Sequence, residues 1–186
     1  MTSNSKVLHI NDEGFVKNVQ FLPSPNYDSR PKNSIISLLV IHNISFPPNK
    51  YGGKYIEQFF TNQLDFSEDP YFQKIKNLKV SPHFVINRVG RLIQFVSCRD
   101  RAWHAGTSEW RGEKKCNDYS IGIELEGSDH IKYTKLQYKK LNQLIDCLTA
   151  KYDIKDVVGH CNIAPGRKTD PGPLFNWDLI NTGKNT

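Results

Sequence analysis

The chain has 186 residues, of which 38% are hydrophobic and 24% are charged, and its formal net charge is +6 at pH 7. This length suits a single domain whose hydrophobic core is large enough to be stable without disulfide bonds. No apolar run of about 18 residues is present, so no membrane-spanning helix is expected. The N-terminal stretch lacks the apolar core and cleavage site of a signal peptide, which favours a cytoplasmic protein with no membrane partner.

The positive charge fits an anionic partner, but the spacing of the lysines and of the cysteines argues against two further classes of protein. The lysines are dispersed, and their densest cluster, TKLQYKKL at 134–141, is typical of the solvated face of a helix. We therefore expect no nucleic-acid partner. The cysteines form no Cys-x-x-Cys pair, which predicts free thiols rather than a disulfide framework or a cysteine zinc site; they are Cys98, Cys116, Cys147 and Cys161.

The first half of the chain predicts an arm, a buried strand, a helix and a hairpin. Residues 1–34 are polar and punctuated by proline, so we expect a largely irregular surface arm on a single domain spanning 1–186. The near-continuous apolar run Ile35–His42 predicts a strand buried on both faces. Apolar residues in Tyr55–Leu64 have helical spacing, and HFVINRVGRLIQFV at 83–96 resembles a hairpin about a Val-Gly turn.

The second half alternates strands and a helix. Ser120–Gly127 alternates like a strand, and Thr134–Tyr152 is the clearest helix, with an apolar stripe and Thr134 and Gln137 at capping-box spacing. The segment IKDVVGH at 154–160 predicts a short strand. This alternation predicts an α/β fold with a mixed central β-sheet flanked by helices.

The segment GHCNIAPGRKTDPGP at 159–173 is rich in glycine and proline, which excludes a long helix or a central strand. We interpret it as a rigid loop that carries His160, Lys168 and Asp170. Rigid loops on a scaffold commonly carry chemistry.

Polar residues stand at the ends of three predicted strands. His42 ends the first, Glu124 lies near the end of the second, and His160 ends the third. Such residues commonly converge at one sheet edge. Two imidazoles and the Asp170 carboxylate would leave a fourth zinc position open to water, as catalytic zinc requires.

Each of these residues also has an ordinary structural interpretation. A histidine at a strand end can simply bond a neighbouring carbonyl group, and Asp170 precedes proline as in an Asx-type turn. Glu124 competes with its neighbour Glu126 for a functional role. Lys168 suits a solvated loop. Cys161 is a possible soft zinc ligand, but its side chain would point away from that of His160 if the segment is extended.

Several motifs in order resemble one known family. They are PSPNYDSRP, LLVIHNISFPP, YGG, VSPHFVINRVGRLIQFV, RAWHAG, CNDYSIGIELEG and GHCNIAPGRKTDPGP, and they extend from about Pro23 to Trp177. The chain resembles the zinc-dependent N-acetylmuramoyl-L-alanine amidases, whose fold is shared by bacteriophage amidases and peptidoglycan-recognition proteins. It is most similar to their cytosolic type, which acts on 1,6-anhydro-muropeptides in cell-wall recycling.

The resemblance implies a role for each motif residue. It implies His42, His160 and Asp170 as zinc ligands, Glu124 as catalytic acid/base, and Lys168 as a group that stabilises the transition state. The expected reaction is hydrolysis of the amide between the lactyl group of N-acetylmuramic acid and L-alanine. The expected partner is a small muropeptide, and the protein is expected to be a monomer.

Candidate substrate contacts complete the prediction. They are Asn43, Lys79, Trp103, His104, Lys115 and Arg167. The recycling type is expected to carry arginine where this chain has Lys79 and Lys115, and lysine offers a point charge instead of a bidentate fork. Two alternatives stay open: an amidase of phage or exported type that acts on polymeric wall, and a module that binds peptidoglycan without cleaving it.

Overall fold

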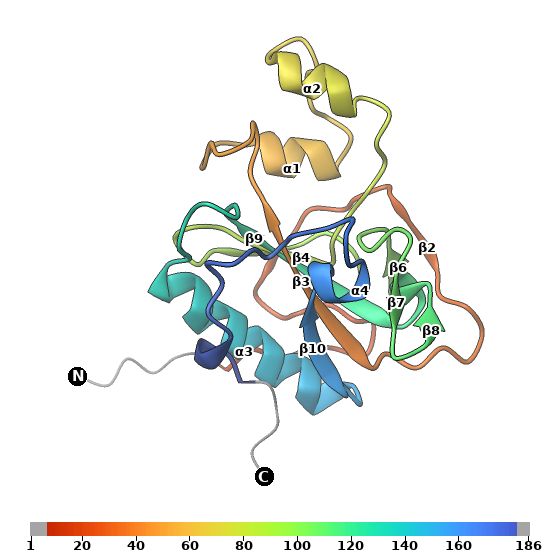
Figure 1. Cartoon of the computed structure of the whole chain (residues 1–186). Coiled ribbons are helices and arrows are strands. Elements are labelled where there is room, and N and C mark those ends of the chain that lie inside the picture. Colours follow the sequence, from red (N-terminus) through yellow and green to blue (C-terminus); the bar gives the residue numbers. More distant parts are fainter. Residues whose placement is uncertain (1–6, 182–186) are drawn as a thin grey trace.

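A computed structural model describes residues 7–181 of the chain and shows a six-stranded mixed sheet with helices on both sides (Figure 1). The strand order is β1 (Gln20–Phe21), β5 (Leu92–Gln94), β4 (Phe84–Ile86), β9 (Ser120–Glu126), β3 (Leu38–Ile44) and β10 (Asp156–Gly159). Within this sheet, β4 and β5 are the one pair that is antiparallel, as the predicted hairpin requires. The predicted α/β fold with a mixed sheet is confirmed.

Three parallel strands, β9, β3 and β10, form one half of the sheet, with β10 at its edge. β3 lies between β9 and β10, and Leu38–Ile41 are almost fully buried, which confirms a strand covered on both faces. Because side chains alternate along a strand, Leu39 and Ile41 join the main core with the odd-numbered residues of β9. Leu38 and Val40 join a smaller core on the opposite face. His42 follows them on that second face.

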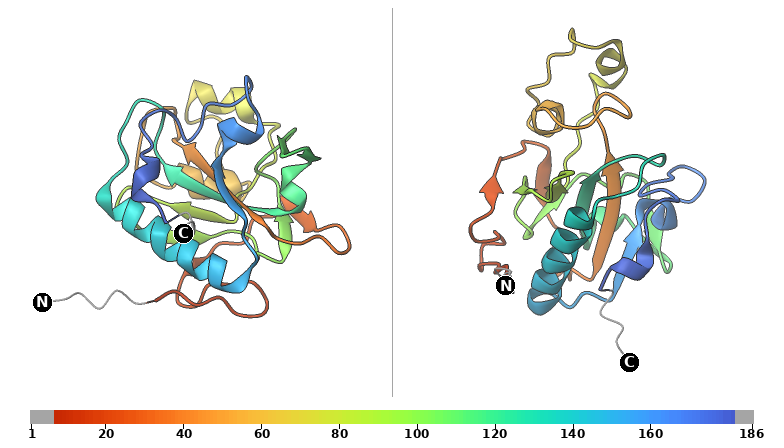
Figure 2. Two further views of the ribbon diagram at one scale, coloured as in Figure 1. Left: turned by 60° about the horizontal axis from the view of Figure 1, so that its bottom comes forward. Right: turned by 90° about the vertical axis from the view of Figure 1, so that its left-hand side faces the viewer.

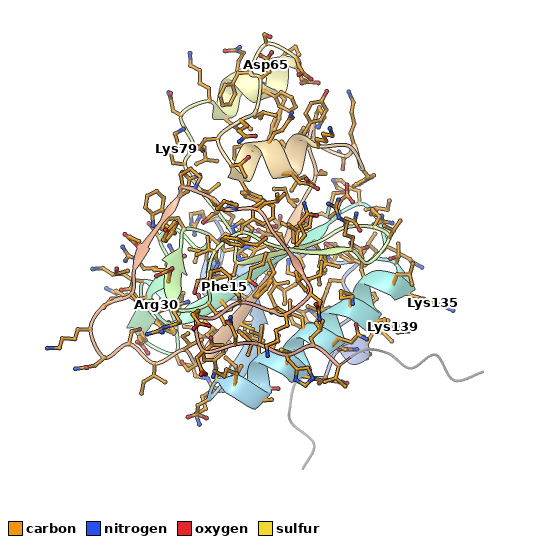
Figure 3. The ribbon with its side chains drawn as sticks, turned by 180° about the vertical axis from the view of Figure 1, so that it is seen from behind. Phe15, Arg30, Asp65, Lys79, Lys135 and Lys139 are labelled. Carbon is orange, nitrogen blue, oxygen red and sulfur yellow. The ribbon has the colours of Figure 1, made fainter. Side chains whose placement is uncertain are left out.

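The main core lies between the sheet and α3 (Lys135–Lys151). The predicted capping box is present, since Thr134 Oγ1 accepts from the Gln137 backbone and the Gln137 side chain accepts from the Thr134 backbone. Lys135 and Lys139 lie on the solvent side of this helix (Figure 3), in agreement with the predicted wet face.

Residues 45–80 form an insertion that lies apart from α3 (Figure 2). It carries α1 (Tyr55–Phe60), shorter than predicted, and α2 (Pro70–Ile75), which the sequence analysis missed. Asp69 caps α2 by accepting from the Tyr71 backbone, with proline at the first helical position. The insertion has its own aromatic core, which packs on Val85, Ile93 and Phe95.

The remaining elements are short. The described part of the predicted arm contributes β1 to the sheet edge, and β2 (Tyr27–Ser29) pairs with β6 (Asp100–Ala102). β7 (Glu109–Trp110) and β8 (Glu113–Lys114) form a hairpin before the 3-10 turn Cys116–Asp118. A second 3-10 turn covers Trp177–Leu179.

The segment at 159–173 is not a loop throughout. It begins with one helical turn, α4 (His160–Ile163), in which the Asn162 side chain accepts from the backbone N–H of Gly159. The rest is irregular, as its glycine and proline content predicted. All four cysteines are free, which confirms the predicted thiols. Within residues 7–181, no helix combines the length and apolar character needed to cross a bilayer.

The core beneath α3 yields a stability prediction. Leu144 is fully buried, whereas Leu136 on the same helix is 53% exposed. Leu144→Ala should lower the free energy of unfolding by about 2–5 kcal/mol because it leaves a cavity. Leu136→Ala, the matched control, should change it by about 0.5 kcal/mol or less. Urea unfolding of both variants measures the difference, and equal losses would contradict this placement of the core.

Candidate active site

A cleft of about 730 Å³ opens on the face of the sheet opposite α3. Its floor carries His42, Glu124 and His160, and its walls come from the insertion, residues 103–106 and residues 167–170. Every polar strand-end residue singled out from the sequence therefore faces one cavity. Its size is within the usual range for small-molecule sites.

Three potential metal ligands meet on the floor. His42 Nδ1 lies 2.9 Å from His160 Nδ1, and each of these atoms lies 3.0 Å from Asp170 Oδ2. Both histidines are buried, and Asp170 is partly buried. The three atoms thus form a nearly equilateral triangle of electron-rich groups, a suitable arrangement for one face of a tetrahedral metal site.

Strand register and backbone contacts bring these ligands together. Gly159 pairs with Ile41, so His160 leaves β10 beside His42 on β3. The Cys161 backbone N–H donates to the Asp170 carbonyl at 2.9 Å, which folds the loop back over α4. A Cβ atom on Gly159 would lie 2.7 Å from the Pro171 ring, so this close return requires glycine.

The second nitrogen of each ring has its own partner. His160 Nε2 lies 3.1 Å from the Ala105 carbonyl oxygen, which can only accept, so Nε2 carries the hydrogen and Nδ1 keeps its lone pair. His42 Nε2 lies 3.0 Å from His104 Nδ1. Metal-bound histidines usually have such outer partners, and the donor set therefore fits a zinc ion.

The charge states that His42 and Asp170 have in the folded protein also suit the binding of a cation. Burial lowers the pKa of His42 to about 4, although its contact with Asp170 works in the opposite direction. Burial alone would raise the pKa of Asp170, but hydrogen bonding to His160 and His42 holds it below its usual range. At neutral pH, His42 is therefore uncharged and Asp170 is ionised, which are the forms that bind metal.

Glu124 lies beside this triangle because β9 pairs with β3 at His42↔Glu124. Its Oε2 atom is buried and has no hydrogen-bond partner among residues 7–181. Burial raises the pKa of Glu124 well above its ordinary value, and the nearby Asp170 carboxylate adds to the rise, whereas Lys168 opposes it. An unsatisfied buried carboxyl group at a cleft is a candidate for proton transfer.

Glu126 is different although it lies on the same face of β9. Its carboxylate accepts from the backbone N–H groups of Gly52 and Arg88, the latter at 3.0 Å. These bonds hold the start of the insertion and the β4–β5 turn against the sheet. Glu126 is thus occupied structurally, which favours Glu124 for chemistry.

The predicted substrate contacts lie in three different settings. Asn43, Lys79 and Trp103 line the cleft together with the exposed Lys168. Asn43 Nδ2 donates to Asp129 Oδ1 at 2.9 Å, and the Trp103 side chain is partly buried. Lys79 lies where the insertion rejoins the rest of the domain (Figure 3).

Of the other three, His104 and Arg167 also line the cleft, but each has additional protein contacts. Arg167 donates to the carbonyl groups of Ala105 at 2.8 Å and Thr107 at 2.5 Å. His104 contacts a ligand histidine, as described above. Lys115 does not line the cleft: it has a left-handed backbone (φ 59°) ahead of the 3-10 turn and an exposed side chain.

The sequence analysis missed several residues that line or support the cleft. Tyr71 and Phe46 of the insertion and Asp129 after β9 line it, and Asn117 contacts its wall. One signal was available, because a glycine inside a strand often marks a close approach. Gly122 is such a residue: a Cβ atom there would lie 2.4 Å from the His104 ring.

Comparison with known proteins gives consistent matches. The sequence profile of the N-acetylmuramoyl-L-alanine amidase family matches residues 31–173. The 1,6-anhydro-N-acetylmuramyl-L-alanine amidase AmpD of Citrobacter freundii is 49% identical over 168 residues, covering 89% of this chain and 90% of that protein. The AmpD of Escherichia coli K12 is 48% identical over 171 residues, covering 89% of this chain and 92% of that protein.

Solved structures agree. A crystal structure of a selenomethionine derivative of AmpD has a TM-score of 0.89 at 47% identity, covering 92% of this chain and 99% of that chain. A complex of E. coli AmiD with the substrate anhydro-N-acetylmuramic acid-L-Ala-D-γ-Glu-L-Lys has a TM-score of 0.56 at 29% identity, covering 92% of this chain and 63% of that chain.

The ligand triangle yields a metal prediction. The purified chain should hold one zinc ion per molecule, and His160→Ala should lose most of it because one of three ligands is gone. Cys161→Ser is the matched control, since the neighbouring thiol is not part of the triangle. Elemental analysis after dialysis measures both, and zinc content that depends on Cys161 would contradict the ligand set.

Proposed function

Because the chain belongs to the N-acetylmuramoyl-L-alanine amidase family, we propose that it hydrolyses 1,6-anhydro-muropeptides in the cytoplasm during cell-wall recycling. The bond cut is the amide between the lactyl group of 1,6-anhydro-N-acetylmuramic acid and L-alanine. The observation that carries this proposal is the buried Glu124 Oε2 atom, which has no hydrogen-bond partner among residues 7–181, beside the triangle of His42, His160 and Asp170.

The relatives support the choice of substrate. The AmpD proteins named above are 1,6-anhydro-N-acetylmuramyl-L-alanine amidases, and each alignment covers about nine tenths of both chains. The AmiD complex contains an anhydro-muramyl tripeptide as substrate. A cytoplasmic location is part of the same proposal, because the recycling type that the sequence resembles is cytosolic.

Zinc is the proposed cofactor, held by His42, His160 and Asp170. When bound there, it would supply a water nucleophile that is active at neutral pH and would polarise the scissile carbonyl group. The chain's own residues then decide where protons and charge go.

Glu124 is the proposed general base and acid. Its position at the cleft floor would let it take the proton of the attacking water and pass that proton to the departing amine of L-alanine. A carboxyl group with a raised pKa both accepts and returns a proton near neutral pH, and burial raises the pKa of Glu124. Its unpartnered Oε2 leaves an acceptor site available for this transfer.

Lys168 and the cleft walls would stabilise charge. The scissile carbonyl oxygen becomes negative in the transition state, and a lysine ammonium beside it stabilises that charge. Lys168 lines the cleft and interacts electrostatically with Glu124. Lys79, on the insertion side, would attract the carboxylates of the stem peptide.

Substitution of Glu124 tests the proposed chemistry. Glu124→Gln should lower kcat roughly 100- to 10,000-fold, because an amide cannot accept the water proton at neutral pH. Zinc content and melting temperature should stay near those of the wild type. A chromatographic assay of peptide release measures kcat, and near-normal turnover would move the proton transfer to another group.

A competition assay tests the substrate. The wild-type protein, with and without a chelator, should release peptide fastest from anhydro-muropeptide, more slowly from the reducing-sugar muropeptide, and slowest from purified sacculi. The physical reason is that a cleft walled by the insertion fits a small ligand, whereas a continuing glycan would collide with that wall. The chelator should abolish all release. Faster release from sacculi would instead identify an amidase of polymeric wall, and binding without release would identify a non-catalytic module.

A further inference from the structure

Residues 104–107 hold both candidate ligand histidines from one side. The His104 ring contacts His42, and the carbonyl group of the next residue, Ala105, contacts His160. Two candidate ligands from different elements, β3 and α4, thus share one outer support. The ring centroids of His42 and His104 are 5.1 Å apart. The two ring planes are nearly perpendicular, so the rings meet in an edge-on arrangement.

The His104 ring has a partner on each nitrogen. Nδ1 lies 3.0 Å from His42 Nε2, and Nε2 lies 3.2 Å from Ser120 Oγ. Metal binding at His42 Nδ1 requires the hydrogen of a neutral ring to be on Nε2. His104 Nδ1 must then accept that hydrogen bond, and its own Nε2–H donates to Ser120.

The fold around His104 is built to keep this ring in place. Asn117 Oδ1 accepts from the backbone N–H of His104 at 3.1 Å and of Ala105 at 2.8 Å. Gly122 lies under the ring, where any Cβ atom would collide with it. Arg167 fixes the same segment through the carbonyl groups of Ala105 and Thr107.

We propose that His104 is a positioning residue for the metal centre: its Nδ1 fixes His42 in the tautomer and orientation that presents Nδ1 to zinc. This inference rests on the proposed function and refines it. His104 also lines the cleft, but both of its ring nitrogens are occupied by protein groups.

Two substitutions of similar shape isolate the hydrogen bond. Asparagine at 104 places Oδ1 near the position of the native Nδ1 and keeps an acceptor, whereas leucine has nearly the same shape and none. His104→Leu should weaken zinc affinity about 10- to 100-fold, the usual effect of losing an outer partner. His104→Asn should restore affinity to within a few-fold of the wild type.

The measurement is competition for zinc between the protein and a chromophoric chelator, with no muropeptide present. His130→Ala is the matched control, because His130 is an exposed histidine that lines the cleft and is not in the ligand group. Its zinc affinity should equal that of the wild type. Equal affinity in the Leu and Asn variants, whether normal or reduced, would overturn the inference.

A second measurement, made on the wild-type protein, tests the inference even if the His104→Leu variant does not fold. Long-range ¹H–¹⁵N correlation spectra of the zinc-bound wild type should show a hydrogen on His42 Nε2. A His42 ring that binds zinc through Nε2, or has no hydrogen there, would overturn the inference. A protein that cuts no muropeptide but keeps the affinity pattern and this signal would overturn only the proposed substrate.

Discussion

The parallel pairing of β9, β3 and β10 is the constraint on which the site depends. It places Glu124 opposite His42 and brings His160 out of the sheet beside them. A one-residue slip would turn each of these side chains to the other face of the sheet. Register is secured by burial, because alternate residues of β3 and β9 pack beneath α3 and cannot exchange places with polar ones.

On the face of β9 opposite α3, each residue has a different structural or functional role. Along β9, Ser120 supports His104, Gly122 makes room for its ring, Glu124 faces the cleft, and Glu126 accepts two backbone hydrogen bonds. These positions have the same side-chain direction and four different uses. The candidate metal site is thus one end of a supporting network of contacts that begins at a backbone turn near Asn117.

Much of this arrangement could be predicted from the sequence where local patterns are strong. The apolar run of β3, the capping box of α3 and the hairpin of β4 and β5 each follow from short-range chemistry and are confirmed. The three ligand candidates could be grouped because all lie at strand ends or in the adjoining rigid loop. The resemblance to the amidase family is likewise confirmed by the match over residues 31–173.

Other features depend on tertiary contacts that no local pattern reveals. α2 is short and packs through Phe72 in the core of the insertion, so its sequence has little helical period. His104 lines the cleft, but no local pattern indicated that its ring lies between His42 and Ser120. Lys115 has a local backbone conformation that leaves it outside the cleft lining. The roles assigned to individual site residues stay predictions.

The separate core of the insertion has a consequence for how this domain can diversify. Its aromatic side chains pack with Val85 and Ile93, whereas the intervening β4 residues Phe84 and Ile86 belong to the main core under α3. The insertion wall of the cleft and the strand that carries His42 are therefore stabilised by largely different sets of contacts, with Ile44 at the end of β3 as the point where they meet. Selection can reshape what the cleft admits while leaving the hydrolytic machinery intact, and a protein engineer seeking a new specificity would begin with residues 45–80.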